Sequence, residues 1–286
     1  MATVGPYAAY GESCVKACAE NGTHYMDVTG EIPWVLRMTQ KYEKIAKSTG
    51  AILISQMGIE STPSDLMAFS SVSAIRKELG CPTREVIMAV HDWKSQASGG
   101  TLASALGLMD HFTLKELTEC AKPFKHSPIP GPTAATSKPW YTRILGIRHV
   151  PLLGTLTTYV GAASDVPIVE RSWGLLGGSQ FYGPNFRYSE YFRVNSPFYG
   201  MIIHFGLLLG QIVLLFGFLR RLIAKKVLQP GEGADESVTS NDFVDYRAVG
   251  YPENARTRQK AFSRVRFDGG LYKCKLSPWK NVIEGG

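Results

Sequence analysis

The chain has 286 residues, 44% of them hydrophobic and 19% charged, a composition that allows one or two globular domains. Its net charge of +7 is densest after residue 219 and forms no aromatic–basic patch, which excludes the usual nucleic-acid-binding modules and favours contact with a membrane surface. Its five cysteines show no CxxC motif and no metal spacing with histidine, and no basic stretch followed by an apolar run opens the chain. These features predict free thiols in a reducing compartment, no metal site and no signal peptide.

The first residues, MATVGPYAAYGE, have the pattern of a strand end followed by a tight loop. Gly5, Pro6 and Gly11 lie within seven positions, and few residues precede them. Because such a loop normally follows a buried strand, we expect the chain to start inside a strand of an incomplete domain.

Helical and strand patterns then alternate. Helical apolar spacing occurs in residues 12–21 and again from about Glu31 to Gly50. Residues 23–28 predict a short strand, and the continuous apolar run at 51–55 is typical of a strand buried on both faces. This alternation predicts a parallel α/β unit, with the loop GPY at the carboxyl end of a strand, where such sheets bind ligands.

Further signals follow in chain order. A helix is expected at TPSD, with Thr62 as its cap, Pro63 as its first residue and Asp65 as the reciprocal acid. Residues 84–93 predict a strand, and SGGT at 98–101 predicts the start of another helix.

The middle of the chain is rich in proline. Five prolines within residues 122–139 predict a linker or a long loop. Beyond them, residues 155–162 predict a strand, Asp165 can cap a short helix, and residues 186–194 alternate like a half-exposed strand.

Residues 198–219 contain no Asp, Glu, Lys or Arg. As a helix they would extend about 33 Å, enough to span a bilayer core of about 30 Å. A buried core helix is the alternative, but so long an uncharged run favours a membrane-associating segment. Residues 262–267 alternate like a strand of the sheet that contains residues 186–194. Since one sheet cannot lie on both sides of a bilayer, we expect a monotopic segment, bent at Gly206 or Gly210 or lying in the interface, with both flanks in the cytosol.

Four blocks in order resemble the saccharopine dehydrogenase-like oxidoreductases over roughly residues 3–267. They are GPYAAYGESCVKACAENGTHYMDVTGE, GIESTPSDL, SGGTLAS and YGPNFRYSEY. The resemblance implies NAD(P)-dependent hydride transfer, in which the protein positions the cofactor, and a lipid-like substrate. The family's GxTGxTG-like turn is absent from the sequence, as are GxGxxG and GxxGxxG. We therefore expect a fragment cut at both ends that does not bind NAD(P) alone.

The expected fold class is α/β, with a partial Rossmann-like parallel sheet followed by an α+β substrate domain that a hydrophobic membrane-associating helix interrupts. The expected domains are residues 1–80, the C-terminal part of the NAD(P)-binding domain; 81–197, the substrate-type domain; 198–219, the membrane segment; and 220–286, a basic region that returns to the α+β domain.

The candidate site residues are small or polar and lie at predicted strand ends and helix starts. The resemblance places Gly5, Pro6 and Tyr7 beside the cofactor. Tyr7 and Asp27 are weak catalytic candidates. The substrate candidates are Glu31, Ser61, Asp65, Ser98, Gly99, Gly100 and Thr101. Each group has a structural alternative, which is a plain strand-to-helix turn for the GPY loop and helix capping for the others.

Two functions remain open. The first is an oxidoreductase acting on a lipid or glycolipid at a membrane or lipid droplet, on the cytosolic face of the droplet or the endoplasmic reticulum, with the mitochondrion and the plasma membrane as alternatives. The second is a non-catalytic membrane or lipid-droplet protein with a degenerate dehydrogenase fold. Neither involves nucleic acid, and a homodimer is compatible with both.

Overall fold

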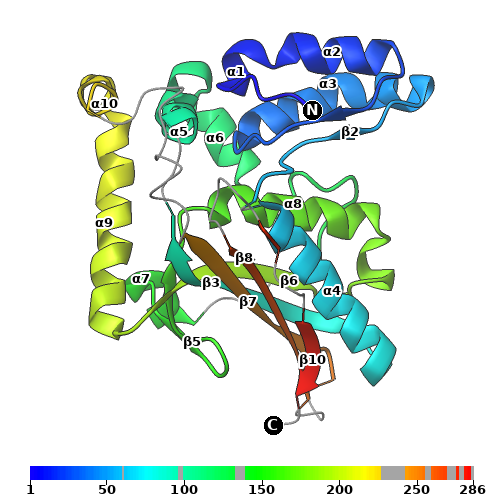
Figure 1. Cartoon of the computed structure of the whole chain (residues 1–286), viewed down its shortest axis with the longest axis vertical. Helices are drawn as coiled ribbons and strands as arrows, with labels where there is room; N and C mark the ends of the chain where they lie inside the picture. Colours follow the sequence, from blue (N-terminus) through cyan, green and yellow to red (C-terminus); the bar gives the residue numbers. More distant parts are fainter. Residues whose placement is uncertain are drawn as a thin grey trace. The chain divides into compact units, whose positions relative to one another are not determined.

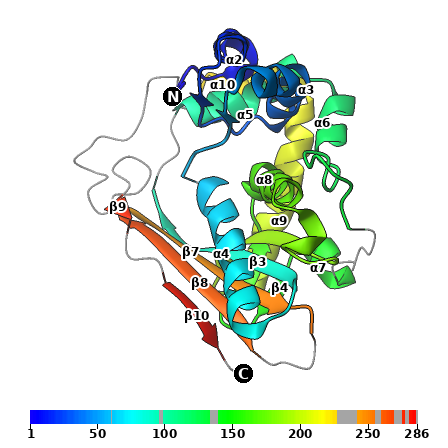
Figure 2. The same ribbon diagram turned by 90° about the vertical axis from the view of Figure 1, so that its right-hand side faces the viewer.

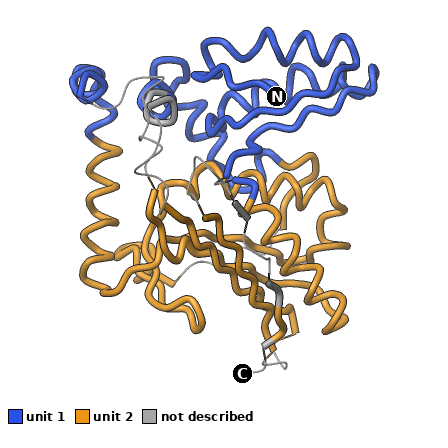
Figure 3. The backbone as a smooth tube through the Cα atoms, viewed as in Figure 1, with its two compact units in different colours: residues 1–62, 96–126, 213–234 blue, residues 63–95, 127–212, 235–286 orange. Residues whose placement is uncertain are grey.

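The computed structural model describes residues 1–59, 61–95, 99–132, 139–226, 242–254, 259–268, 275–276 and 280–284. They form an α/β structure that divides into two compact units (Figure 3). Unit 1 comprises residues 1–62, 96–126 and 213–234, and unit 2 comprises residues 63–95, 127–212 and 235–286. The domain boundaries expected from the sequence stay a prediction, because compactness does not test whether a segment folds independently.

Unit 1 contains a small parallel sheet with helices (Figure 1). Its elements are α1 Tyr7–Tyr10, α2 Glu12–Glu20, β1 Tyr25–Met26, α3 Ile32–Thr49, β2 Leu53–Ile54, α5 Gly99–His111, α6 Leu114–Cys120 and α10 Gly217–Ala224. Strand β1 pairs with β2 in parallel, and Ala2 forms a parallel bridge to Asp27. The two strands predicted at 23–28 and 51–55 are therefore present but short.

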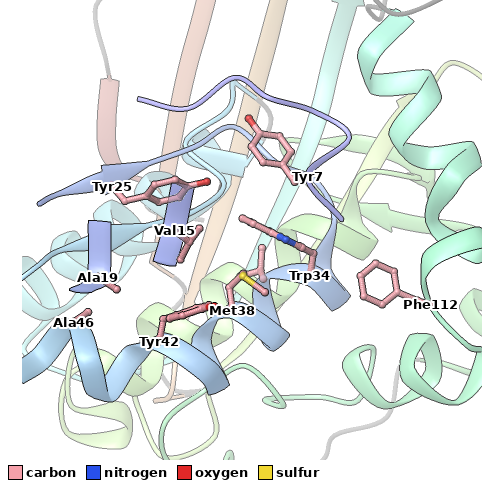
Figure 4. Packing of buried hydrophobic residues seen from close by; sticks show 10 residues of the cluster. Tyr7, Val15, Ala19, Tyr25, Trp34, Met38, Tyr42, Ala46 and Phe112 are labelled. Atoms are coloured by element: carbon pink, nitrogen blue, oxygen red, sulfur yellow. The ribbon is translucent and has the colours of Figure 1, made fainter. Parts of the chain in front are cut away.

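The core of unit 1 lies on one face of this sheet. Tyr25 packs there with Trp34, Met38 and Tyr42 from α3 and with residues of α1 and α2 (Figure 4). Strand β2 was expected to be buried on both faces, and this prediction is wrong. Ile54 points away from the core and is 39% exposed, because side chains alternate along a strand and the core covers one face.

Unit 2 is built on a mixed sheet. Its strands follow the order β10-β8-β7-β3-β6-β5-β4, and β9 pairs with β8. Their bounds are β3 Thr83–Lys94, β4 Arg148–Val150, β5 Gly154–Thr158, β6 Arg187–Val194, β7 Phe243–Pro252, β8 Lys260–Asp268, β9 Lys275–Leu276 and β10 Lys280–Glu284. Among the described strands of this sheet, β3 and β6 form the parallel pair and the other neighbours are antiparallel. The α/β class is confirmed, whereas the large sheet is mixed and not parallel.

Helices α4 Ser61–Leu79 and α8 Ala162–Leu175 pack on one face of the unit 2 sheet (Figure 2). The Ser71 hydroxyl of α4 lies 3.0 Å from that of Ser263 on β8. The opposite face carries a small core of its own, formed by Ile87, Ala89, Val150, Leu153, Leu156, Tyr191 and Val249. The remaining helices are α7 Trp140–Leu145, η1 Gly178–Gln180 and α9 Pro197–Leu215, and the last three residues of α9 belong to unit 1.

The apolar segment forms two helices, although the sequence predicted one. Helix α9 ends at Leu215, Phe216 has an extended backbone (φ −88°, ψ 108°), and α10 begins at Gly217. The bend expected at Gly206 or Gly210 does not occur, because both lie inside α9. Two contacts of Arg220 hold the chain where the two helices meet. Arg220 donates to the carbonyl of Leu214 (2.8 Å), which satisfies an orphan carbonyl at the end of α9. Arg220 also pairs with Asp110 of α5 (2.7 Å), a residue far away in the sequence.

Helix α9 is mostly exposed. By length and composition it is the one helix of the described residues that could cross a membrane, and 11% of its most apolar window is buried. This excludes the buried core helix that was the alternative. Its first turns attach to unit 2, where Thr157 donates to the carbonyl of Gly200 (2.7 Å) and the Thr158 hydroxyl lies 2.8 Å from Nδ1 of His204.

Candidate functional site

The loops that follow Ala2, β1 and β2 converge in unit 1. Tyr7 follows the first loop as the first residue of α1, and it is buried against Trp34 with ring centroids 5.4 Å apart. Its hydroxyl donates to the carbonyl of Ala2 (2.9 Å) and accepts from the backbone N–H of Val28 (3.3 Å). Burial raises the pKa of Tyr7. The side chain that was a catalytic candidate therefore joins the first two parallel segments.

Glu31 is buried at the start of α3 and acts on a different helix. Its two carboxylate oxygens accept from the backbone N–H groups of Tyr7 (2.7 Å) and Ala8 (2.8 Å). These donors open α1, whose N-cap residue Pro6 has no capping side chain. The structural alternative of helix capping describes the geometry well, although the capped helix is α1 and not α3. A substrate role for Glu31 stays a prediction.

Asp27 connects the second loop to the third. It is fully buried, and its Oδ1 accepts from the backbone N–H groups of Thr29 (3.1 Å) and Gln56 (2.9 Å). Its Oδ2 has no hydrogen-bond partner among the described residues. Gln56 itself has φ +67°, a left-handed conformation that is uncommon outside glycine. A buried carboxylate oxygen beside a strained backbone is where a ligand hydroxyl or a proton is expected.

The GPY loop offers few free donors. Pro6 has no N–H, and Glu31 already occupies the N–H groups of Tyr7 and Ala8. A Cβ added to Gly5 would meet its nearest neighbour at an ordinary 3.5 Å, so close packing does not require glycine there. A cofactor contact by Gly5, Pro6 and Tyr7 stays a prediction, and it would have to use groups other than these two amides.

The other candidates lie apart from this cluster or outside what the structure describes. Ser61 is buried at the start of α4, in unit 1. Gly99, Gly100 and Thr101 form the first turn of α5, and Ser98 lies outside the described residues.

Asp65 belongs to unit 2, and its expected role as a reciprocal capping acid is wrong. Its Oδ2 accepts from the Ser172 hydroxyl of α8 (2.7 Å), and burial raises its pKa to about 6. Helix α4 begins at Ser61, so Thr62 and Pro63 lie inside its first turn and are not the cap and first residue.

Sequence reasoning missed Gln56 and Tyr25. Tyr25 is buried on the strand face that also carries Asp27, and burial followed by the charge of Asp27 raises the pKa of its hydroxyl. The two-residue spacing of Tyr25 and Asp27 on a strand was the signal that could have found the pair. Gln56 gave no signal, because its role comes from its backbone conformation. Groups of three or more His, Cys, Asp or Glu able to hold a metal are absent from the described residues.

No protein-family model matches the chain, but several known proteins are similar to it over most of its length. A Mycobacterium tuberculosis protein named as a trans-acting enoyl reductase is 31% identical over 287 residues, covering 94% of this chain and 66% of the relative. A Caenorhabditis elegans lipid droplet localized protein is 29% identical, covering 77% and 50%. A Bos taurus saccharopine dehydrogenase-like oxidoreductase is 30% identical, covering 78% and 50%. The chain thus spans about half to two thirds of the length of these relatives.

Proposed function

The chain belongs to the family of the saccharopine dehydrogenase-like oxidoreductases, and we propose that it is part of an NAD(P)-dependent oxidoreductase acting on a lipid-like substrate at a membrane or lipid-droplet surface. The names of the relatives support an oxidoreductase and, for the nematode protein, a lipid droplet. The link between this reaction and lipid or glycolipid metabolism is part of our proposal and goes beyond what those names state.

The observation that carries this proposal is the meeting of three loops at the carboxyl ends of parallel segments in unit 1. Open parallel sheets bind nucleotides and substrates at this edge. Asp27 connects two of these loops through Oδ1, and its buried Oδ2, near the hydroxyl of Tyr25, is the oxygen that we assign to a ligand hydroxyl. We assign Asp27 to the binding of a ribose or substrate hydroxyl, and the loop of Gly5, Pro6 and Tyr7 to the side of the cofactor.

The cofactor itself requires a further element. A dinucleotide pyrophosphate is normally held by a glycine-rich turn at a helix N-terminus, and the sequence has no such motif. We therefore expect that NADPH titrated into the 286-residue protein gives no saturable fluorescence change at micromolar concentrations. Micromolar saturation that Asp27→Asn weakens would place the whole cofactor site in this chain and contradict that expectation.

The surface association rests on α9. Most of its exposed side chains are apolar, including Phe198, Ile202, Phe205, Leu209 and Ile212, although Gln211 is exposed as well. The basic residues Arg221, Lys225 and Lys226 follow in and after α10, and such groups are attracted to anionic lipid headgroups. We assign α9 to the hydrophobic surface of a membrane or lipid droplet.

One observation favours the non-catalytic alternative. The polar groups of Tyr7 and Glu31 are engaged in hydrogen bonds that hold unit 1 together, as expected for a degenerate site kept for its fold. Asp27→Asn separates the two functions, because an amide oxygen can keep the bonds from Thr29 and Gln56. In cells deprived of the protein, lipid profiles restored by the wild type and not by Asp27→Asn support the enzyme. Equal restoration supports the alternative.

A further inference from the structure

The sheet face of unit 2 that lies away from α4 carries several arginines, and four of them lie on three strands, β6, β7 and β8, near Asp245 and His91. Arg247 on β7 pairs across the sheet with Arg264 on β8, and Arg266 is opposite Asp245. Ser263 contacts Ser71 of α4, so the side chain of the next residue, Arg264, points to the other face. Arg193 on β6 is opposite Leu156, which belongs to the small core of that same face. We call Arg193, Arg247, Arg264 and Arg266 the arginine face.

A single buried acid organises two of these guanidinium groups. Asp245 has a side chain that is 3% exposed. Its Oδ1 accepts from Nε of Arg264 (2.9 Å), and its Oδ2 accepts from Nη2 of Arg264 and from Nη2 of Arg247 (2.9 Å each). The two guanidinium groups are thereby held next to each other, and among the described residues Asp245 engages fewer than half of their N–H donors.

The charge of the arginine face is not balanced. Arg266 pairs with Asp268 (2.8 Å), whereas Arg193 has no carboxylate within 4.0 Å in the described part of the chain. Asp245 therefore pairs with two cations, Arg247 and Arg264, while Arg193 acts on the neighbouring His91, so this part of the face carries more arginines than the acids that pair with them. Like charges directly opposite each other on neighbouring strands are unfavourable, so the free protein bears a cost here that a bound anion would remove.

His91 on β3 lies in the positive electrostatic field of these arginines. Its Nδ1 lies 4.0 Å from Oδ2 of Asp245 and has no hydrogen-bond partner among the described residues. Burial, followed by the charges of Arg247 and Arg193, lowers its pKa to about 4. The imidazole is therefore neutral at physiological pH, and one of its nitrogens is unpaired beside the arginines.

We propose that the arginine face binds a phosphate group, with Arg193, Arg247 and Arg264 as its donors. Planar guanidinium groups recognise phosphate oxygens in pairs of parallel hydrogen bonds, and Asp245 orients two of them in advance. The phosphate is either the headgroup of an anionic lipid or part of a soluble phosphate ester. This site does not depend on the oxidoreductase proposal, because none of its residues belongs to the loops of unit 1.

The test uses the 286-residue protein and a variant that leaves Asp245 paired. Arg193→Gln removes one donor without breaking an ion pair, and we expect it to weaken phosphate binding about tenfold. Arg84→Gln, an exposed position at the other end of β3, is the matched control because it changes the net charge equally. Arg264→Lys keeps the charge and loses the paired geometry, and it should weaken binding as well. Thermal melting confirms that each variant is folded.

Two sets of probes separate the sources of the phosphate. Calorimetric titration with inorganic phosphate and pyrophosphate at constant ionic strength tests soluble ligands. Flotation with phosphatidylcholine vesicles, with and without phosphatidic acid, tests lipid headgroups. Saturable binding or a phosphatidic acid-dependent gain that Arg193→Gln reduces and Arg84→Gln does not supports the site. Absence of binding to every phosphate probe, or equal losses in the two variants, would overturn it.

Discussion

Asp65 is a largely buried carboxyl group whose protonation depends on its surroundings. Ser172 donates to one oxygen, and the other has no hydrogen-bond partner among the described residues. Because burial raises its pKa from 3.8 to about 6, the folded state binds more protons than the unfolded state between these values. The free energy of unfolding contributed by this group is therefore full below about pH 4 and is lost as the pH rises through 6.

Asp65→Asn should remove this pH dependence. The amide keeps an acceptor for Ser172 and carries no charge at any pH. We expect a gain in unfolding free energy of up to about 3 kcal/mol at pH 7 and little gain at pH 4, measured by urea denaturation at both values. Asp92→Asn, an exposed carboxyl on β3, serves as the control and should change little. Equal destabilisation by Asp65→Asn at both pH values would contradict this account.

Gly11 is required by close packing between α1, α2 and α3. A Cβ at this position would lie 2.8 Å from Cζ2 of Trp34 and 2.9 Å from the backbone oxygen of Tyr7, closer than carbon atoms approach. We expect Gly11→Ala to destabilise the protein by about 1–3 kcal/mol. Gly107→Ala in α5, where a Cβ meets nothing within 4 Å, should instead be neutral or stabilising. Thermal melting of the two variants distinguishes them, and similar shifts would show that packing at Gly11 is not tight.

Among the elements, α3 could be predicted from sequence and β7 could not. Helix α3 is amphipathic, and its apolar positions Val35, Met38 and Tyr42 reach the core as their spacing predicts. Strand β7 lies in the middle of the large sheet but contains Asp245 and Arg247. These charges are tolerated only because Arg264 pairs with Asp245 across the sheet, and that contact is invisible in the local sequence.

The candidate site could likewise be predicted from the sequence only in part, because its side chains have partners far away in the sequence. The GPY and DVTGE loops were placed at strand ends by local pattern, and the structure brings them together with the loop that follows β2. The hydroxyl of Tyr7, however, contacts a carbonyl before it and an amide after it, and Glu31 caps a helix more than twenty residues earlier. Long-range partners of this kind set the role of a side chain, and no periodicity encodes them.

Helix α9 offers a direct test of surface association. Leu209 is 62% exposed on this helix, and Leu114 is 58% exposed on α6. A charge placed in the hydrocarbon region costs about 2.5–3.5 kcal/mol, so Leu209→Asp should lower partitioning to phosphatidylcholine vesicles or to lipid droplets by at least about tenfold. Leu114→Asp introduces the same charge at the start of a helix, where it is favourable, and should leave partitioning unchanged. Equal behaviour of the two variants in flotation would argue against insertion of α9.

For the whole molecule, the sheet of unit 2 restricts how α9 can meet a bilayer. Strand β6 precedes α9 and strands β7 and β8 follow it, and all three belong to one sheet, which confirms the expectation for residues 262–267. A single crossing by α9 would separate β6 from β7. A second crossing between them would need an apolar run, whereas residues 226–242 contain Lys226, Glu232, Asp235, Glu236 and Asp242. This connectivity predicts a monotopic arrangement with both flanks of α9 on the same side of the bilayer, and we expect that side to be the cytosolic one.

Glycosylation in cells tests this topology, because the chain has an acceptor before α9 and one substitution creates another after it. Asn21-Gly22-Thr23 is a natural acceptor sequence at an exposed position, and Arg256→Thr creates a second one at Asn254. We expect neither site to be modified, since glycosylation takes place in the lumen. The same protein directed into the lumen by an added signal peptide is the control, and it should be modified at both sites. Modification of Asn21 alone, or of Asn254 alone, in the undirected protein would establish a spanning helix and require the sheet to form differently.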